Sequence, residues 1–386
     1  MSQAPAEVAE LRLEGRLLLD GELVPGVVVL AGDRIAGVER GGVELAADAP
    51  IVAPGLIDLH VHGFAGCDPL RGLVKGVGGF AGEAMGEPRG STGDGGLAGM
   101  ASALARAGTT AFQPTLFPMA PVALGERAAA CWRRAGELEA TAGHARVLGL
   151  HLEGPFVNPL AAGALPVADL AEPSPAALAA LLGSATGDGR GIRTLTLAPE
   201  LAGSAELIAE LERAGVRASF GHSRATAAEA RATLRSVTGA TSGAGSRSAP
   251  FGVTHLFNAM TGLHHRDPGL ASLALTDEAL VVELIGDLVH VGPEAIDLAL
   301  RARGPAGLAL VSDALEGAGT GCDVLAIPHN SNLSNGQLFA TDLDTETAEA
   351  RSTLERRSAR MGKGGQGLPG KVRGLCRPGN NTFFAR

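Results

Sequence analysis

Short apolar runs alternate with longer amphipathic stretches along most of the chain. Eight runs of strand length occur in order, at residues 51–63, 109–116, 147–154, 192–200, 216–223, 252–260, 280–287 and 306–314. The stretches between them have helical character, and three of them, 97–108, 204–215 and 293–304, end in the glycine that favours helix C-termini. Because parallel strands need helical crossovers, the pattern predicts the α/β class.

Eight strand-and-helix units are the number that closes a (β/α)8 TIM-like barrel. An open doubly wound sheet has the same alternation and is the alternative. Upstream, aliphatic runs in residues 11–52 are separated by Asp20-Gly21 and Gly32-Asp33, which is typical of β-hairpins. We expect a small N-terminal β-sandwich element in residues 1–53, the barrel in residues 54–320, and an atypical tail in residues 321–386 whose folding stays open.

The composition fits a folded protein and narrows its partners. Of 386 residues, 45% are hydrophobic and 19% are charged, and the formal net charge is -9. An acidic protein repels a phosphate backbone, so we expect no nucleic-acid partner. The first residues lack the features of a signal peptide, no run is long enough to span a membrane, and the four cysteines form no C-x-x-C pair. These features predict a cytoplasmic protein.

Polar side chains cluster where the predicted strands end. Asp58, His60 and His62 are spaced by two residues and therefore share one face of the first strand. The ends of later strands carry His151, Glu153, Glu200, His222, His255, Asn258 and Asp313. Taken singly, each has an ordinary structural explanation, such as a helix cap for Asp313. Together, at the rim where a barrel places its chemistry, they predict a site for zinc or a related divalent ion.

Glu153 gives further support for a cation site, because it directly follows the apolar run 147–152. A carboxylate at the end of a buried strand is costly unless a partner compensates its charge. The following Gly154-Pro155 could form a turn that carries the carboxylate into solvent. The other strand-end ligands favour the alternative, in which a cation compensates Glu153 in place.

The motifs at these strand ends resemble those of the amidohydrolase superfamily and, within it, the N-acetylglucosamine-6-phosphate deacetylase family. They are PGLIDLHVHG (54–63), HLEGPFVNP (151–159), LAPE (197–200), FGHS (220–223), THLFNAM (254–260), RDPGL (266–270) and VSDA (311–314). The resemblance covers residues 13–319, and this ordered series is a narrow match. It implies metal-dependent hydrolysis of the acetamide of N-acetyl-D-glucosamine 6-phosphate, giving D-glucosamine 6-phosphate and acetate.

The resemblance also implies a role for each matching residue. Glu153, His222 and His255 would hold the principal divalent ion, expected to be zinc, and His60 and His62 would line a second, optional site. Asp313 would be the catalytic acid and base, because it would accept a proton from a water whose pKa the ion lowers towards about 7. The substrate-binding residues would be Asn258, Ala259, Ala164, Arg266 and His290. The family often forms dimers, so a homodimer is expected.

Three departures from the family pattern bear on activity. The family's Gly-Ala-His, whose histidine helps to hold the substrate, is Gly163-Ala164-Leu165 here, and loss of an oxyanion donor costs about a hundredfold or more in turnover. Glycine- and serine-rich additions at about 71–94 and 236–250 are typical of disordered loops. After Gly321 the resemblance stops, and residues 323–339 resemble an uncharacterised family of PHP-like metal-dependent proteins.

These departures leave two alternatives to the implied activity. One is a deacetylase that acts on another N-acetylated amino sugar. The other is a truncated, non-catalytic relic that binds metal or sugar phosphate without turnover.

Overall fold

The computed structural model describes residues 10–32, 34–46, 48–73, 95–186, 191–240 and 251–320. The chain divides into two compact units, the first ending at Leu56 and the second beginning at Ile57. The predicted tail 321–386 and most of the two predicted additions lie outside the described residues.

The N-terminal unit contains a four-stranded sheet with the order β3-β2-β1-β4. β1 (Glu10–Leu19) and β2 (Glu22–Ala31) are antiparallel, and β3 (Arg34–Arg40) continues the meander. Asp20 and Gly21 join the first two strands with positive φ angles of 52° and 83°, as a tight hairpin turn requires. The predicted hairpins are therefore confirmed.

One predicted barrel strand is divided between the two units. The run 51–63 was expected to be a single strand, but β4 (Ile51–Val52) pairs in parallel with β1 in the small sheet. The barrel strand β5 (Leu56–Val61) begins only after Pro54 and Gly55. Proline lacks a backbone donor, so this dipeptide interrupts the ladder between the two strands.

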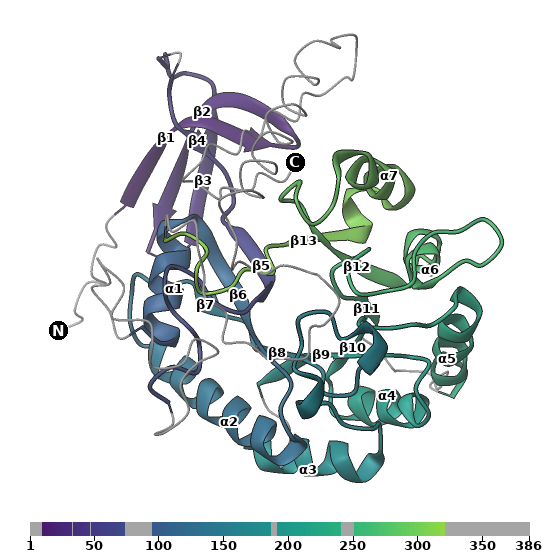
Figure 1. Ribbon diagram of the computed structural model, residues 1–386. Coiled ribbons are helices and arrows are strands. Elements are labelled where there is room, and N and C mark those ends of the chain that lie inside the picture. Colours follow the sequence, from purple (N-terminus) through teal and green to yellow (C-terminus); the bar gives the residue numbers. More distant parts are fainter. Residues whose placement is uncertain are drawn as a thin grey trace, which may run out of the picture. The chain divides into compact units, whose positions relative to one another are not determined.

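The second unit is built on eight strands in the order β13-β12-β11-β10-β9-β8-β6-β5. After β5 they are β6 (Thr109–Leu116), β8 (Leu150–Glu153), β9 (Ile192–Leu197), β10 (Arg217–Phe220), β11 (Phe251–Val253), β12 (Leu280–Ile285) and β13 (Leu308–Val311), and the short β7 (Arg146–Val147) pairs with β6. The backbone N–H groups of His62 and Gly63 donate to the carbonyl of Ala314 at 2.8 and 3.0 Å, which brings the two edge strands together. The sheet is a nearly closed TIM-like barrel, as predicted (Figure 1).

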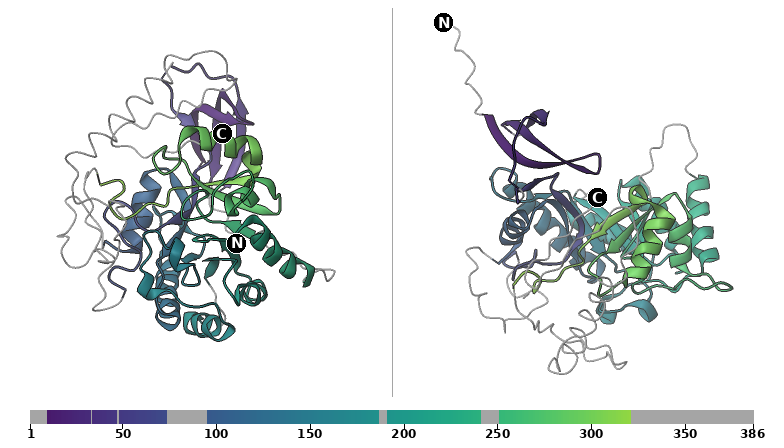
Figure 2. Two further views of the ribbon diagram at one scale, coloured as in Figure 1. Left: turned by 45° about the vertical axis from the view of Figure 1, so that its right-hand side comes forward. Right: turned by 90° about the horizontal axis from the view of Figure 1, so that it is seen from above.

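Helices connect the successive strands and lie outside them (Figures 1 and 2). They are α1 (Leu97–Arg106), α2 (Pro121–Leu138), α3 (Pro175–Thr186), α4 (Ser204–Arg213), α5 (Ala227–Ala240), α6 (Leu270–Thr276) and α7 (Pro293–Arg303). The three helices predicted from their terminal glycines are α1, α4 and α7. α5 continues to Ala240, so the first part of the predicted loop 236–250 is helical instead. None of the described helices is long and apolar enough to cross a membrane.

Alternation along the strands separates an apolar core from a polar barrel interior. In β8, Leu150 and Leu152 are fully buried in the main hydrophobic cluster, whereas His151 between them contacts Thr196 Oγ1 through Nε2 at 2.7 Å. Thr196 Oγ1 in turn lies 2.8 Å from Thr254 Oγ1. These bonds satisfy polar groups that would be costly to bury alone. The interior network leads directly to the end of the barrel where the candidate site lies.

Candidate metal centre

Six predicted site residues converge at the carboxyl ends of the barrel strands. Two belong to β5 and the residue after it, one ends β8, and three follow β10, β11 and β13 by two residues each. In chain order they are His60, His62, Glu153, His222, His255 and Asp313. All are buried except Asp313, whose side chain is 24% exposed. The convergence expected from the barrel topology is therefore present.

The principal triad consists of Glu153, His222 and His255. Glu153 Oε1 lies 3.0 Å from His222 Nε2 and 3.0 Å from His255 Nε2, and the two Nε2 atoms are 3.0 Å apart. Ligands bonded to a tetrahedral zinc ion at about 2.0–2.1 Å lie at comparable distances from one another. The donor set of two imidazoles and one carboxylate thus fits a divalent ion in both chemistry and spacing.

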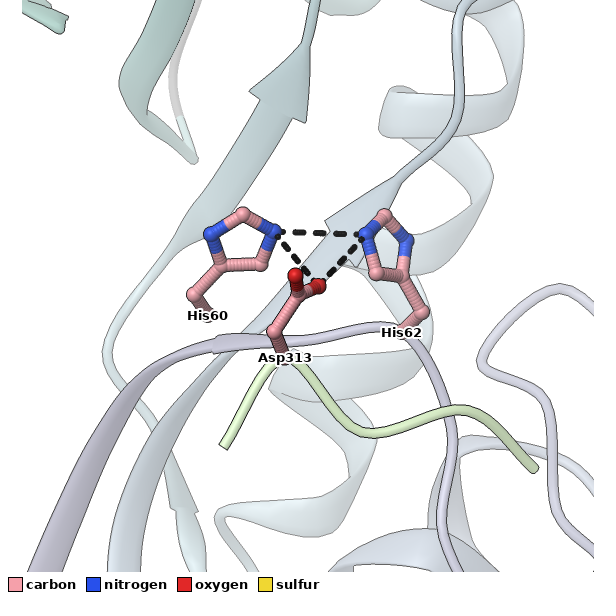
Figure 3. Close-up of side chains that lie close together, drawn as sticks. All are labelled: His60, His62 and Asp313. Carbon is pink, nitrogen blue, oxygen red and sulfur yellow. Dashed lines mark hydrogen bonds and ion pairs between the residues drawn. The ribbon is translucent and has the colours of Figure 1, made fainter. Parts of the chain in front are cut away.

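The second triad consists of His60, His62 and Asp313, whose side chains point toward one another (Figure 3). His60 Nε2 lies 3.3 Å from His62 Nε2 and 3.2 Å from Asp313 Oδ1. Glu153 joins the two triads, because its Oε2 is 3.1 Å from His62 Nε2 while its Oε1 faces the principal triad. A single carboxylate is therefore placed between two potential cation positions.

Three of these residues have a backbone conformation that side chains other than glycine seldom adopt. φ is 47° at His222, 33° at His255 and 49° at Asp313. Such left-handed conformations are sterically unfavourable and persist only where the surroundings enforce them. His222 Nδ1 donates to Ala161 O at 2.9 Å, and the backbone N–H of Asp313 donates to His60 O at 2.9 Å. These bonds hold the rings and the carboxylate toward one another.

Opposite charges inside the cluster shift several pKa values. Burial acts to lower the pKa of His60, but Asp313 and Glu153 outweigh it and raise that pKa to about 10. Burial acts to raise the pKa of Glu153, but the neighbouring imidazoles, His60 first, hold it well below its usual range. Burial and the charge of His60 lower the pKa of His151 to about 3, so this ring is neutral. Glu153 is thus ionised, and uptake of a cation by this cluster would compete with the proton on His60.

Two other strand-end acids have structural partners. Asp58 accepts hydrogen bonds from Ser312 Oγ at 2.5 Å and from the backbone N–H of Ser312 at 3.2 Å, so it ties β5 to the segment that follows β13. Glu200 accepts bonds from Asn158 Nδ2 at 2.9 Å and Ser223 Oγ at 2.7 Å. Neither acid belongs to the triads, and both hold the loops that carry them.

The predicted substrate-binding residues lie on the loops after the strands. Asn258 is half-buried, and its Nδ2 donates to His255 O at 3.3 Å, whereas Ala259 has a φ of 47° and accepts a bond from Ser223 N at 3.1 Å. Ala164 and Arg266 are exposed. The side chain of His290 is 50% exposed, and its Nδ1 lies 2.6 Å from Asp287 Oδ2. This pairing, together with the charge of Asp287, raises the pKa of His290.

Leu165 packs in a small apolar cluster. It is 5% exposed and contacts Val157 and Ala162, with Phe117 and Leu170 packed against them. The Phe117 ring stacks on the His62 ring with centroids 3.9 Å apart. Leu165 therefore contributes to an apolar wall beside the second triad.

Sequence reasoning missed Glu283 on β12. It is 7% exposed, and its Oε2 lies 3.0 Å from His60 Nδ1. The available signal was an acid in the middle of the buried run LVVELI, which had been assigned only as a strand. Because its partner lies 223 positions away in the chain, local pattern could not identify it.

Several known proteins are similar in sequence to most of this chain. N-acetylglucosamine-6-phosphate deacetylase from Rattus norvegicus is 34% identical over 314 residues, which is 80% of this chain and 68% of the rat protein. The chain belongs to the N-acetylglucosamine-6-phosphate deacetylase family. N-acetylgalactosamine-6-phosphate deacetylase from Escherichia coli O157:H7 is 32% identical over 310 residues, covering 80% of this chain and 72% of that protein. Family membership thus establishes a deacetylase family for amino-sugar phosphates and leaves the particular sugar open.

Solved structures support the family fold. A mutant of N-acetyl-D-glucosamine-6-phosphate deacetylase from Mycobacterium smegmatis, in complex with N-acetyl-D-glucosamine-6-phosphate, matches with a TM-score of 0.62 and 28% identity. The match covers 83% of this chain and 74% of that chain. Separately, a family described as "Protein of unknown function (DUF3604)" matches residues 309–363. This range includes 323–339, where the sequence predicts a resemblance to an uncharacterised family, and most of it lies outside the described residues.

Proposed function

We propose that this chain is a zinc-dependent deacetylase that hydrolyses N-acetyl-D-glucosamine 6-phosphate to D-glucosamine 6-phosphate and acetate. The observation that most supports this proposal is the principal triad, whose three donor atoms lie 3.0 Å from one another. The carboxylate of Asp313 lies at the more open side of the same cluster. The names of the relatives support the substrate class.

Glu153, His222 and His255 would hold the principal ion, and His60 and His62 would hold a second. When bound, such an ion supplies the positive charge that polarises a carbonyl and lowers the pKa of water towards about 7. Imidazole nitrogens and a carboxylate oxygen suit zinc among the common divalent ions. The buried histidines also exclude bulk water, which strengthens electrostatic interactions within the site.

Asp313 is the proposed catalytic acid and base. Its side chain is more exposed than the other groups of the cluster, at 24%, so it can meet both water and substrate. The carboxylate accepts a proton from the attacking water as the oxygen bonds to the acetyl carbon. The resulting carboxyl group then protonates the amine nitrogen as the carbon–nitrogen bond breaks. Each proton taken from water is thereby returned to the leaving group.

The loops around the cluster supply the proposed substrate contacts. Arg266 is exposed, and a guanidinium group matches the geometry of phosphate oxygens. His290 is held by Asp287 and has a raised pKa, which favours the cationic ring that a phosphate attracts. Asn258, Ala259 and Ala164 would bind the sugar and its acetamide through side-chain and main-chain groups.

N-acetyl-D-galactosamine 6-phosphate is the second candidate substrate. The observation that favours it is the relative of that specificity from Escherichia coli, whose 32% identity is close to that of the rat protein. The two sugars differ only in the configuration of one hydroxyl group, and both carry the acetamide and the phosphate. The same catalytic groups would therefore serve either substrate.

Amine release by the purified, zinc-loaded chain tests the proposal. The two sugar phosphates are compared with unphosphorylated N-acetylglucosamine, and the variants are Asp313→Asn and, as a matched control, Asp297→Asn on the exposed face of α7. We expect turnover of N-acetylglucosamine 6-phosphate that Asp313→Asn reduces by about 10²–10⁴-fold and Asp297→Asn preserves. Faster turnover of the galactose isomer would favour the second candidate. Zinc binding without turnover of any sugar would refute catalysis and favour a binding relic.

A further inference from the structure

Glu283 has an unusual position for a carboxylate that the proposed reaction does not use. It lies on β12, is 7% exposed, and directs Oε2 toward two different elements of the site. One contact is with His60 Nδ1 at 3.0 Å, and the other is with the backbone N–H of His255 at 3.4 Å. Burial of a carboxylate costs free energy, so these contacts compensate a charge that an apolar residue would have avoided.

The contact with Glu283 determines which face His60 offers to the second triad. An ionised carboxylate has only acceptors, so the shared proton is on His60 Nδ1. His60 Nε2 then faces the opposite side, where Asp313 Oδ1 lies at 3.2 Å and His62 Nε2 at 3.3 Å. The ring is also held by His151, whose edge contacts it with centroids 4.6 Å apart. Glu283 thus orients the ring and selects the nitrogen that is available as a ligand.

His60, His151 and Glu283 also lie close enough to be considered a third cation site. Both nitrogens of His151 already have partners, however, because Nε2 is 2.7 Å from Thr196 Oγ1 and Nδ1 is 3.3 Å from Leu59 O. Glu283 is likewise engaged by the Nδ1 atom of His60. This group is therefore better described as a hydrogen-bonded support beneath the second triad.

The histidines of the principal triad contact Glu283 less directly, because the only such contact among the described residues is the one from the backbone N–H of His255 at 3.4 Å. His222 Nδ1 has its own acceptor, the carbonyl of Ala161 at 2.9 Å. His62 Nδ1 has no hydrogen-bond partner among the described residues, so His60 is the better-held imidazole of the second triad. Partners that orient a ligating histidine typically change metal affinity by about 10- to 100-fold. Loss of Glu283 should therefore weaken the second triad more than the principal one.

We propose that Glu283 is a positioning residue for a divalent-cation site at His60, His62 and Asp313, and that it determines whether this triad takes up an ion. The proposal rests on the metal centre of the proposed function. It extends that function, because the affinity of the second triad for an ion would depend on a residue that contacts neither the ion nor the substrate.

Zinc titration of the chelator-stripped, full-length chain tests the proposal. Bound zinc is counted by elemental analysis, and the affinity of each equivalent is measured by competition with a chromophoric chelator. The variants are Glu283→Gln, His60→Ala, the double variant, and Glu316→Gln. Glu316 is a matched control because it is 9% exposed and its carboxylate pairs with Arg71 at 2.8 Å and not with a histidine. Thermal melts of the stripped proteins measure any general loss of stability.

We expect two equivalents in the wild type and in Glu316→Gln. Glu283→Gln should bind the second equivalent about 10- to 100-fold more weakly and leave the first nearly unchanged. In the His60→Ala background the same substitution should cause no further loss, because Glu283 acts through His60. If Glu283→Gln does not fold, Glu283→Asp replaces it, because the shorter side chain keeps the charge but places it farther from His60. Glu283→Asp should lower the affinity for the second zinc equivalent alone.

Several outcomes would overturn the inference. The first is that Glu283→Gln, or Glu283→Asp in its place, binds both zinc equivalents with wild-type affinity. The second is that it loses affinity for both equivalents equally, and the third is that the losses of the two single variants add in the double variant. The fourth is that the wild-type chain binds a single ion and that His60→Ala retains it. Because these are binding measurements, they are independent of turnover. A chain that binds two zinc ions but deacetylates no sugar would refute the proposed function and still test the role of Glu283.

Discussion

Glu200 joins three loops at the rim of the barrel, and its substitution provides a quantitative test of how the principal triad is held. The half-buried carboxylate accepts hydrogen bonds from Asn158 Nδ2 at 2.9 Å, Ser223 Oγ at 2.7 Å and Arg224 N at 2.6 Å. Ser223 and Arg224 directly follow His222, and the backbone N–H of Asn158 donates to His222 O at 3.0 Å. Glu200 therefore restrains both the segment that directly follows His222 and the loop whose Asn158 N–H bonds the carbonyl of this left-handed residue.

The magnitude follows from these three bonds. A hydrogen bond to a charged group contributes about 1.5–3 kcal/mol, and partial exposure places these bonds near the lower limit. Glu200→Gln keeps the shape and one acceptor, but it removes the charge and turns an amide N–H toward a donor. We expect the free energy of unfolding to fall by about 2–4 kcal/mol. Because His222 is then less restrained, zinc affinity at the principal triad should fall by about tenfold.

Urea unfolding of the stripped chain and zinc competition measure the two effects. The control is Glu126→Gln, because Glu126 is exposed on α2, and such a surface substitution should change the free energy of unfolding by less than about 0.5 kcal/mol. If Glu200→Gln matched Glu126→Gln in stability and in zinc affinity, the three hydrogen bonds would not restrain His222, and the reasoning would be refuted.

Four further predictions concern the same site. Asp313→Asn should reduce turnover by about 10²–10⁴-fold and leave one zinc equivalent bound, as amine release and elemental analysis would show. Zinc at about 100 times its Kd should stabilise the stripped chain by about 2.7 kcal/mol, and an unchanged melting temperature would contradict the site. Asp287 raises the pKa of His290, whose charge is present below that pKa and lost as pH rises through it, so KM for the phosphorylated sugar should begin to rise at lower pH in Asp287→Asn; identical KM profiles would exclude this role. Leu165→His should lower stability by about 1–3 kcal/mol in urea unfolding without faster turnover, because it buries an imidazole in an apolar cluster.

The barrel and most of its ligand set were predictable because both depend on local pattern. Most strands are short apolar runs with polar residues at or just after their ends, and parallel topology brings those polar residues to one rim without any knowledge of contacts. His222 and His255 could be placed in this way from their motifs alone. The division of 51–63 between two sheets was not predictable, because the apolar pattern continues through Pro54-Gly55 and only the pairing of Ile51–Val52 with β1 separates the two parts.

The supporting contacts were less accessible to sequence reasoning. Glu283 and His60 are 223 positions apart, and Asp58 and Ser312 are 254 positions apart. A single sequence gives no signal for such pairs, because side-chain periodicity assigns a face and not a partner. The burial of Leu165 was hidden in part for the same reason, since Phe117, which packs against its cluster, comes from another segment of the chain.

Burial distinguishes the roles of the three acids that surround His60. Glu283 and Glu153 have side chains that are 9% and 4% exposed, and each is held by imidazole nitrogens at 3.0 Å. A carboxylate so enclosed cannot exchange protons readily with water, so it is suited to orient or bind and not to act as an acid and base. Asp313 is 24% exposed and lies 3.2 Å from His60 Nε2, so one side of it faces the cluster and the other is open to solvent. The depth of each carboxylate in the barrel thus separates two groups suited to holding a charge from Asp313, which is open to water.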